Sequence, residues 1–182
     1  MLRGLSVLLL SSSLALTACG GDASAPAVTD PGDAQTPPQG QVNVEAWIAT
    51  GQYKSWAKEA AVHASRSPSP HGFNRIYSNG KVAANAAGTA VWPIGAAAVK
   101  ELYKSASDTV PTGYAVYLKT AASAGGAGWY WYERAAADLV ADGKGDSGNA
   151  KSVCVACHVG AGSDAAHTPT PNGRDFVYTA IQ

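Results

Sequence analysis

The sequence predicts an α+β fold with short N-terminal helices, a mainly antiparallel β-sheet and a short C-terminal helix. Apolar residues recur at helical spacing before residue 61, whereas aromatic and β-branched residues form short runs between residues 74 and 134. Such runs favour the strands of a sheet that is packed on both sides. The same runs, together with the 20 glycines of the chain, disfavour a four-helix bundle.

Between residues 44 and 60, the spacing of apolar residues predicts two short helices, or one helix that is interrupted at Gly51. The apolar positions with this spacing are Val44, Trp47, Ile48, Tyr53, Trp56, Ala57 and Ala60. The proline-containing run Ser65–Pro70 then ends helical structure and forms a loop.

Strands are predicted for the segments that follow this loop. They cover residues 74–77, 97–103, 113–119 and 129–134. Residues 78–80 predict a turn, and residues 121–128 predict a hairpin connection made of small residues. Residues 138–146 are interpreted as a flexible glycine-rich linker, because their acidic spacing lacks the glutamate that closes a calcium loop.

The alternation of side chains along a strand assigns residues to faces. Lys100 is expected to share a face with Ala98 and Leu102 and to point toward a cofactor, or else to extend to the edge of the sheet. Glu101 is expected on the opposite face, where we interpret it as structural. In the next strand, Tyr114, Val116 and Leu118 share one face.

Residues 1–18 predict a lipoprotein signal peptide. A short basic start precedes an apolar stretch that is too short to span a bilayer, and the segment ends in Leu16-Thr17-Ala18-Cys19. This ending resembles a bacterial lipobox, which makes Cys19 the predicted lipidation site. The alternative is an ordinary cleaved secretory signal that contains a cysteine. Both interpretations predict export.

Residues 19–41 predict a disordered tether, and residues 42–182 predict one domain with one core. The formal net charge of the chain is zero, so nucleic acid and anionic membrane surfaces are not expected as electrostatic partners. Attachment to a membrane is therefore expected through the lipid anchor only.

The most informative motif is Cys154-Val155-Ala156-Cys157-His158, which is the attachment motif of a c-type haem. Two cysteines with this spacing reach the two vinyl groups of one porphyrin, and the adjacent histidine becomes the axial ligand of the iron. We therefore predict one haem c, attached through Cys154 and Cys157 and ligated by His158. Haem attachment outside the cytoplasm agrees with the export signal.

Three other interpretations of the cysteine pair remain as alternatives: a disulfide, a thioredoxin-like redox pair and half of a zinc site. A zinc site needs further soft ligands, and the only other cysteine is Cys19. A redox pair does not need His158, and its usual βαβ context is not predicted here.

The iron's sixth ligand separates an electron carrier from a haem that binds or transforms a small molecule. The only methionine is Met1, in the predicted signal peptide, so a His/Met cytochrome is excluded. A second nitrogen ligand or an open position remains. The candidate nitrogens are those of His63, His71, His167 and the lysines, and His71 is the best placed because it lies in a loop between Pro70 and Gly72.

Several segments together resemble the cytochrome P-460 / cytochrome c′-beta family. These segments are Pro70–Gly72, Asn74–Tyr77, Pro93–Leu102, Trp129–Tyr132, the Cys154–His158 motif and Gly173–Val177. The resemblance implies a mainly antiparallel β fold with a pentacoordinate haem c, often dimeric. Members of the family bind nitric oxide or, in the P-460 branch, oxidise hydroxylamine.

The resemblance also implies roles for individual residues. Lys100 matches the lysine that becomes covalently joined to the porphyrin in the P-460 branch. The glutamate that serves there as the distal base has no counterpart in residues 114–128, which contain no acidic residue. Glu133 is the nearest acid, and we expect it to face solvent.

A distal pocket lined by Phe73, His71 and Tyr117 would suit a small neutral molecule such as nitric oxide. The sequence thus favours a haem protein with an open distal site for a small nitrogen-oxide-type ligand. The alternatives are a hydroxylamine-oxidising oxidoreductase with a Lys100–haem cross-link and a six-coordinate electron-transfer cytochrome.

Further expectations concern location and partners. We expect lipid anchoring at the cell envelope of a Gram-negative-type bacterium, a periplasmic electron-transfer partner and, from the resemblance, a homodimer. Arg174 and Asp175 are expected to pair with each other, or Arg174 with a haem propionate.

Overall fold

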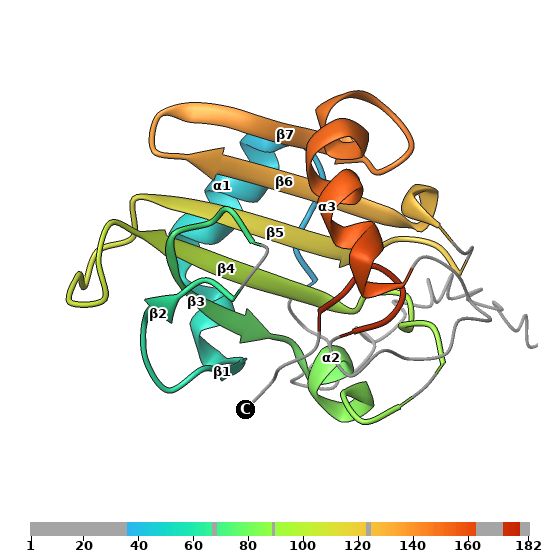
Figure 1. Ribbon diagram of the computed structural model, residues 1–182, viewed down its shortest axis with the longest axis horizontal. Coiled ribbons are helices and arrows are strands. Elements are labelled where there is room, and N and C mark those ends of the chain that lie inside the picture. The colour runs from blue at the N-terminus through green and yellow to red at the C-terminus, as the bar shows by residue number, and fades with distance from the viewer. Residues whose placement is uncertain (1–35, 67–68, 89, 123–124, 163–172, 179–182) are drawn as a thin grey trace, which may run out of the picture.

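The computed structural model describes residues 36–66, 69–88, 90–122, 125–162 and 173–178. Within these residues, seven strands form one sheet in the order β1-β3-β4-β5-β6-β7, with β2 also paired to β3 (Figure 1). Every pairing is antiparallel. The strands are β1 (Ala57–Lys58), β2 (His63–Ala64), β3 (Phe73–Ser78), β4 (Ala97–Tyr103), β5 (Gly113–Lys119), β6 (Trp129–Ala135) and β7 (Asp138–Lys144). The predicted fold class is confirmed.

The helices are short and flank the sheet. They are α1 (Gln41–Thr50), η1 (Gln52–Ser55), α2 (Gly80–Asn85), η2 (Gly126–Gly128), η3 (Ala150–Val155), α3 (Ala156–His158) and η4 (Val159–Ala161). Gly51 interrupts the first two as predicted, because it adopts a left-handed conformation with φ 69° and its N–H bonds the Ile48 carbonyl. The predicted helical positions Ala57 and Ala60 are wrong, since the chain from Ala57 pairs with β3 instead.

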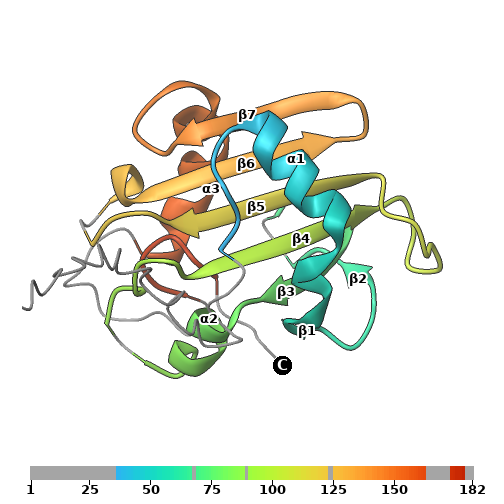
Figure 2. The same ribbon diagram turned by 180° about the vertical axis from the view of Figure 1, so that it is seen from behind.

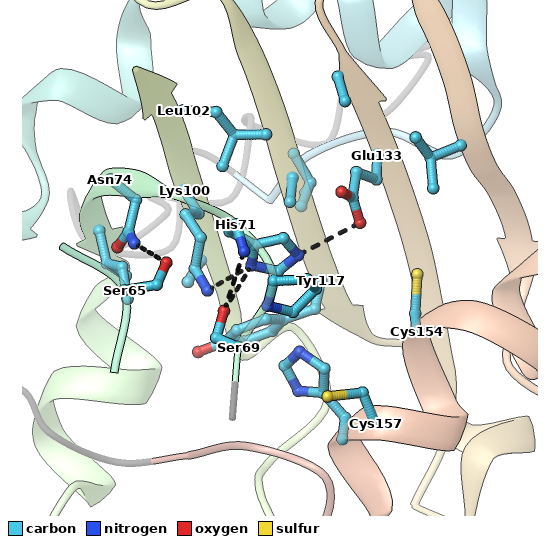
Figure 3. A pocket seen from close by; sticks show the side chains of 18 of the residues that line it. Ser65, Ser69, His71, Asn74, Lys100, Leu102, Tyr117, Glu133, Cys154 and Cys157 are labelled. Atoms are coloured by element: carbon cyan, nitrogen blue, oxygen red, sulfur yellow. Dashed lines mark hydrogen bonds and ion pairs between the residues drawn. The ribbon is translucent and has the colours of Figure 1, made fainter. Parts of the chain in front are cut away.

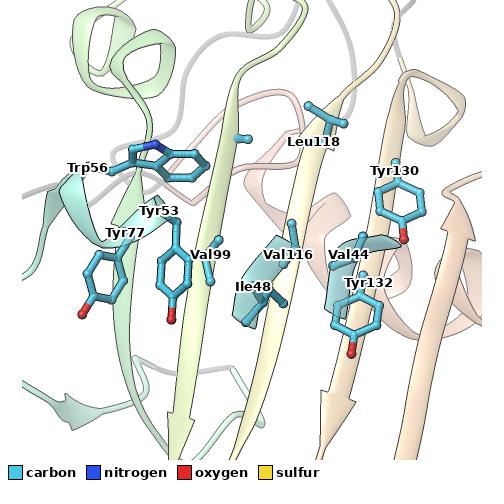
Figure 4. Close-up of a cluster of buried hydrophobic side chains, with 11 residues drawn as sticks. Val44, Ile48, Tyr53, Trp56, Tyr77, Val99, Val116, Leu118, Tyr130 and Tyr132 are labelled. Carbon is cyan, nitrogen blue, oxygen red and sulfur yellow. The ribbon is translucent and has the colours of Figure 1, made fainter. Parts of the chain in front are cut away.

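One face of the sheet, here called the α1 face, is covered by α1 (Figure 2). Its buried residues come from α1, η1 and the central strands and are drawn in Figure 4: Val44, Ile48, Tyr53, Trp56, Tyr77, Ala97, Val99, Val116, Leu118, Tyr130 and Tyr132. Burying each large side chain of this kind contributes about 1.5–3 kcal/mol.

The opposite face, here called the cavity face, lies under α2, the η3–α3 segment and residues 173–178. Its buried cluster contains Val82, Trp92, Ala96, Trp129, Trp131, Ala141, Ala150, Cys154, Phe176 and Val177. Strand β6 therefore contributes alternate aromatic rings to both clusters. This arrangement confirms the prediction that its unbroken aromatic series belongs to a sheet packed on both sides.

Two elements differ from the predictions. The predicted turn at residues 78–80 leads directly into α2, because the Asn79 side chain accepts a hydrogen bond from Val82 N at 3.1 Å and so caps the helix. The predicted glycine-rich linker is wrong, since residues 138–144 form strand β7. Asp142 in this strand accepts a hydrogen bond from the Tyr130 hydroxyl at 2.6 Å, which gives it a structural role.

The predicted signal peptide and Cys19 lie outside the described residues, as does most of the tether. At the end of the tether, Gly40 N donates to the Tyr130 hydroxyl at 3.0 Å and Gln41 N donates to Asp142 at 2.9 Å. None of the helices in the described residues has the length and apolar character needed to cross a membrane.

Candidate functional site

A cavity of about 970 Å³ lies between the cavity face of the sheet, the loop before β3 and the η3–α3 segment (Figure 3). This size falls at the upper end of the range of about 300–1,000 Å³ typical of cofactor and ligand sites. Apolar residues such as Ala98, Leu102 and Ala115 form part of its wall. Ionisable side chains from four different segments complete the wall, so the cavity combines an apolar surface with convergent polar groups.

The cysteine motif lies where a π-helix, η3, passes into the single turn α3. π-Helical turns are rare and occur often at functional sites. Cys154 and Cys157 both line the cavity and both are free thiols. Burial raises the pKa of the Cys154 thiol to about 12, and nearby Glu133 adds to this effect. The motif therefore presents two unpaired sulfur atoms to one cavity.

His158 follows on the same turn and is oriented by a hydrogen bond. Its Nδ1 lies 2.7 Å from the Phe176 carbonyl oxygen, which can only accept, so Nδ1 carries the proton and Nε2 is left as an electron-pair donor. Burial lowers the pKa of His158 to about 3, with a further contribution from the charge of Lys100. The imidazole is thus neutral at physiological pH, which is the form that binds a metal. Trp131 packs against it at a centroid distance of 4.6 Å.

Across the cavity, Lys100 of β4 donates a hydrogen bond from Nζ to Nδ1 of His71 at 2.9 Å. Lys100 lies on the cavity face with Ala98 and Leu102, as the strand alternation predicts. Burial lowers the pKa of Lys100 to about 8, although Glu133 and Glu59 oppose this change. A substantial share of this amine is therefore neutral slightly above physiological pH.

His71 continues the row to a carboxylate. Because its Nδ1 accepts from Lys100, its Nε2 carries the proton, and this atom lies 3.4 Å from Glu133 Oε2. The Glu133 residue is 8% exposed and lines the cavity, so the prediction that it faces solvent is wrong. Lys100, His71 and Glu133 form a connected row, here called the distal row (Figure 3).

Comparison with protein families assigns the chain to a family. The model of the cytochrome P460 family matches residues 50–179, well over half of the chain. The chain belongs to the cytochrome P460 family. No curated protein and no solved structure matches it. Membership of the P460 family implies that the chain is a c-type haem protein.

The residues of the cavity fit the haem c of the P460 family. Two thiols lie on adjacent helical turns, and a neutral imidazole beside them has its Nε2 available for iron. The backbone acceptor on Nδ1 is the outer partner that metal-ligating histidines usually have. Among the described residues, no group of three or more His, Cys, Asp or Glu side chains is placed to hold a metal ion by itself.

The other predicted site residues occupy different positions. Tyr117 lines the cavity, and its hydroxyl has no hydrogen-bond partner among the described residues; burial raises its pKa. Phe73 alternates with the cavity-lining Asn74 and so belongs to the α1 face. His63 pairs with Glu59 at 2.9 Å, and His167 lies outside the described residues.

Sequence reasoning missed two acidic groups. Glu133 could have been found, because alternation from Trp129 and Trp131 places it on their face of β6. Asp175 was expected to pair with Arg174, but it pairs with Lys119 of β5 at 2.8 Å instead. Arg174 stacks over Trp92, with its guanidinium carbon 3.8 Å from the ring centroid, and donates to backbone carbonyls at the end of α2. No local signal connects Asp175 with a lysine so distant in the sequence.

Proposed function

We propose that this P460-family chain is an exported haem protein that binds and oxidises hydroxylamine or a related small nitrogen compound. One haem c is attached through Cys154 and Cys157, with His158 as the axial ligand. When bound, the haem supplies a redox-active iron with one coordination position open to the cavity. The distal row of Lys100, His71 and Glu133 is the observation that carries this proposal.

Oxidation of hydroxylamine releases protons as well as electrons, so a base near the substrate is needed. Glu133 is a carboxylate in the cavity wall, and its Oε2 lies 3.4 Å from Nε2 of His71. A carboxylate offers about four lone-pair positions, so Glu133 retains acceptor sites for a substrate N–H or O–H proton. The electrons leave to a periplasmic electron-transfer partner. Glu133 thus supplies the acid–base group that residues 114–128 lack.

Lys100 is the candidate for a covalent link to the porphyrin. A neutral amine is the nucleophilic form of lysine, and the lowered pKa of Lys100 makes this form accessible near neutral pH. Nδ1 of His71 lies 2.9 Å away and can take the amine proton. The new C–N bond would replace a porphyrin C–H bond, so its formation also releases a second proton and two electrons, which a two-electron oxidant such as a peroxide would accept. Protease digestion and mass spectrometry test the link: a peptide that joins Lys100 to the haem-bound cysteines supports it, and a free Lys100 peptide from fully matured protein refutes it.

The distal row supports a six-coordinate electron carrier, with His71 as the sixth iron ligand, less well than it supports oxidation of a small molecule. Both ring nitrogens of His71 have protein partners, since Nδ1 lies near Lys100 and Ser69 and Nε2 faces Glu133. We therefore expect a high-spin ferrous haem. A low-spin spectrum in both oxidation states would favour the six-coordinate alternative.

A second candidate function is binding of nitric oxide without turnover. The unpartnered hydroxyl of Tyr117 favours it, because one donor beside apolar Ala98 and Leu102 suits a small, weakly polar diatomic molecule. The two candidates differ in whether the cavity must accept protons from its ligand.

The deciding experiment gives the holoprotein hydroxylamine together with a one-electron acceptor dye. We expect dye reduction by the native protein and a loss of about 100-fold or more in kcat for Glu133→Gln, the usual scale for a general base. Glu45→Gln is the matched control, because Glu45 pairs with Arg134 away from the cavity. Nitric oxide binding without any dye reduction by the native protein would reject oxidation and leave the second candidate.

We also propose where the mature chain is located and how it assembles. The mature chain is lipidated at Cys19, faces the periplasm at the cell envelope of a Gram-negative-type bacterium and forms a homodimer. Cell fractionation checks the anchor, with native protein in the membrane fraction and Cys19→Ser lost from it. Light scattering checks the dimer.

A further inference from the structure

A buried ion pair lies behind the proximal histidine, outside the distal row. Lys119 Nζ of β5 lies 2.8 Å and 3.0 Å from the two carboxylate oxygens of Asp175, and both side chains are 0% exposed. The two residues stand 56 positions apart in the sequence. The pair therefore ties the C-terminal segment to the central sheet.

The remaining acceptor positions of Asp175 are also occupied. The Trp129 indole N–H donates to Oδ1 at 3.1 Å, and the backbone N–H of Trp92 donates to Oδ2 at 3.1 Å. Each carboxylate oxygen thus receives the lysine and one neutral donor. Buried ion pairs contribute little net stability because both charges lose their hydration, so such a complete set of partners indicates a role in fixing geometry.

The ion pair between Lys119 and Asp175 fixes an unusual backbone turn. Asp175 and Phe176 have φ values of 42° and 66°, in the left-handed region that non-glycine residues seldom adopt. Two backbone hydrogen bonds between Arg174 and Val177 close this turn. A conformation of this kind persists only where its surroundings hold it, and the anchored Asp175 side chain does so here.

The turn presents one backbone group to the haem site. The Phe176 carbonyl oxygen lies 2.7 Å from His158 Nδ1, and the Phe176 N–H bonds the Gly162 carbonyl at 2.7 Å. An acceptor at Nδ1 fixes the tautomer of a ligating histidine and makes its Nε2 a stronger donor to the metal. A chain of contacts therefore connects Lys119 to the iron-binding nitrogen without any direct contact between them.

We infer that Lys119 and Asp175 are positioning residues that set the strength of the bond between His158 and the haem iron. This inference rests on the proposed ligation by His158. Loss of the Lys119–Asp175 ion pair lets the turn at Asp175 and Phe176 relax, so the Phe176 carbonyl moves away from Nδ1 of His158. The His158 imidazole then becomes a weaker electron-pair donor to the iron. A weaker donor stabilises ferric iron less, so the reduction potential rises.

The test compares Asp175→Asn with the native holoprotein in its reduced state. Resonance Raman spectroscopy should show a lower iron–histidine stretching frequency in the variant, and redox titration should show a higher potential. The matched control is Glu101→Gln, which also removes a buried carboxylate but lies on the α1 face with Tyr53 and Tyr103 as donors. Its frequency and potential should stay at the native values.

Asp175→Asn leaves Lys119 buried without its counter-charge and so risks misfolding. The double variant Lys119→Met/Asp175→Leu removes both charges and should fold while showing the same two shifts. A stretching band that stays at the native frequency in the folded variants overturns the inference and leaves ligation by His158 intact. Absence of the band from the native protein itself overturns the ligation, and the inference with it.

Discussion

Adjacent residues of β4 place their ionisable groups in different surroundings on the two faces of the sheet. Glu101 points to the α1 face, is 2% exposed and accepts hydrogen bonds of 2.5 Å from both the Tyr53 and the Tyr103 hydroxyls. Lys100 points to the cavity face and contacts His71, which in turn lies beside Glu133. The Glu101 carboxylate is therefore enclosed by two tyrosine hydroxyls, whereas Lys100 belongs to the distal row, which lies beside the cavity.

The difference shows how one sheet supports both packing and chemistry. On the α1 face, α1 and η1 fill the volume over the strands, so a buried carboxylate has to be satisfied by the fold itself. On the cavity face, the η3–α3 segment leaves about 970 Å³ free, so the ionisable groups of the distal row keep part of their bonding capacity for a cofactor and its ligand. Substitutions on the two faces should therefore change different properties.

The largest effect should come from removing the haem attachment on the cavity face. Cys154→Ala/Cys157→Ala should abolish covalently bound haem, because no thiol would then remain to form a thioether. Denaturing electrophoresis with a stain for haem peroxidase activity measures the outcome against native protein expressed in the same host. Retention of covalent haem in the double variant would contradict the assignment of the attachment site.

On the α1 face, Glu101→Ala should destabilise the fold by roughly 3 kcal/mol, because two buried tyrosine hydroxyls lose their acceptor. Glu133→Ala should cost less than Glu101→Ala, since this carboxylate faces the cavity and has, among the described residues, one partner, His71 at 3.4 Å, instead of two buried hydroxyl donors. Urea unfolding of both variants measures the contrast. Equal destabilisation would show that Glu133 is as structural as Glu101.

In protein that carries no link between Lys100 and the haem, the pH dependence of folding stability should reveal the cost of burying Lys100. Because burial lowers its folded-state pKa to about 8 from 10.5, the unfolded chain holds more protons between these values, and the stability of the native chain rises with pH across that window. Lys100→Met should therefore be more stable than native protein by about 1–2 kcal/mol near pH 7 and lose that advantage above pH 10. Unfolding curves across this range measure the difference, and a difference that does not change with pH would refute the lowered pKa.

The smallest effect should come from Tyr117→Phe, which removes from the cavity wall one hydroxyl that has no hydrogen-bond partner in the part of the chain that the structure describes. We expect nitric oxide to dissociate a few times faster, consistent with the loss of one hydrogen bond worth about 1 kcal/mol. Stopped-flow absorbance of the holoprotein measures the rate. Tyr114→Phe is the control, because Tyr114 packs on the α1 face.

The sequence by itself determined the features that depend on local geometry. The spacing of Cys154, Cys157 and His158 places two thiols and an imidazole on consecutive helical turns wherever the segment lies. The two-residue period of a strand placed Lys100 with Ala98 and Leu102, and Glu101 on the other face, before any strand pairing was known. The break in the helix at Gly51 was also predictable from local geometry, since glycine adopts the left-handed cap conformation without strain.

Only the tertiary structure decided which face held the cavity and which distant groups met there. A glycine-rich segment forms strand β7 because it pairs with β6, and Glu133 becomes part of the cavity because β6 pairs in register with β5. His71 joins Lys100 and Glu133 from a separate loop, and Asp175 finds Lys119 across the sheet. These contacts depend on strand register and loop packing, which no local sequence pattern encodes. The distal row and the hydrogen bond that orients His158 therefore form only when the chain is folded.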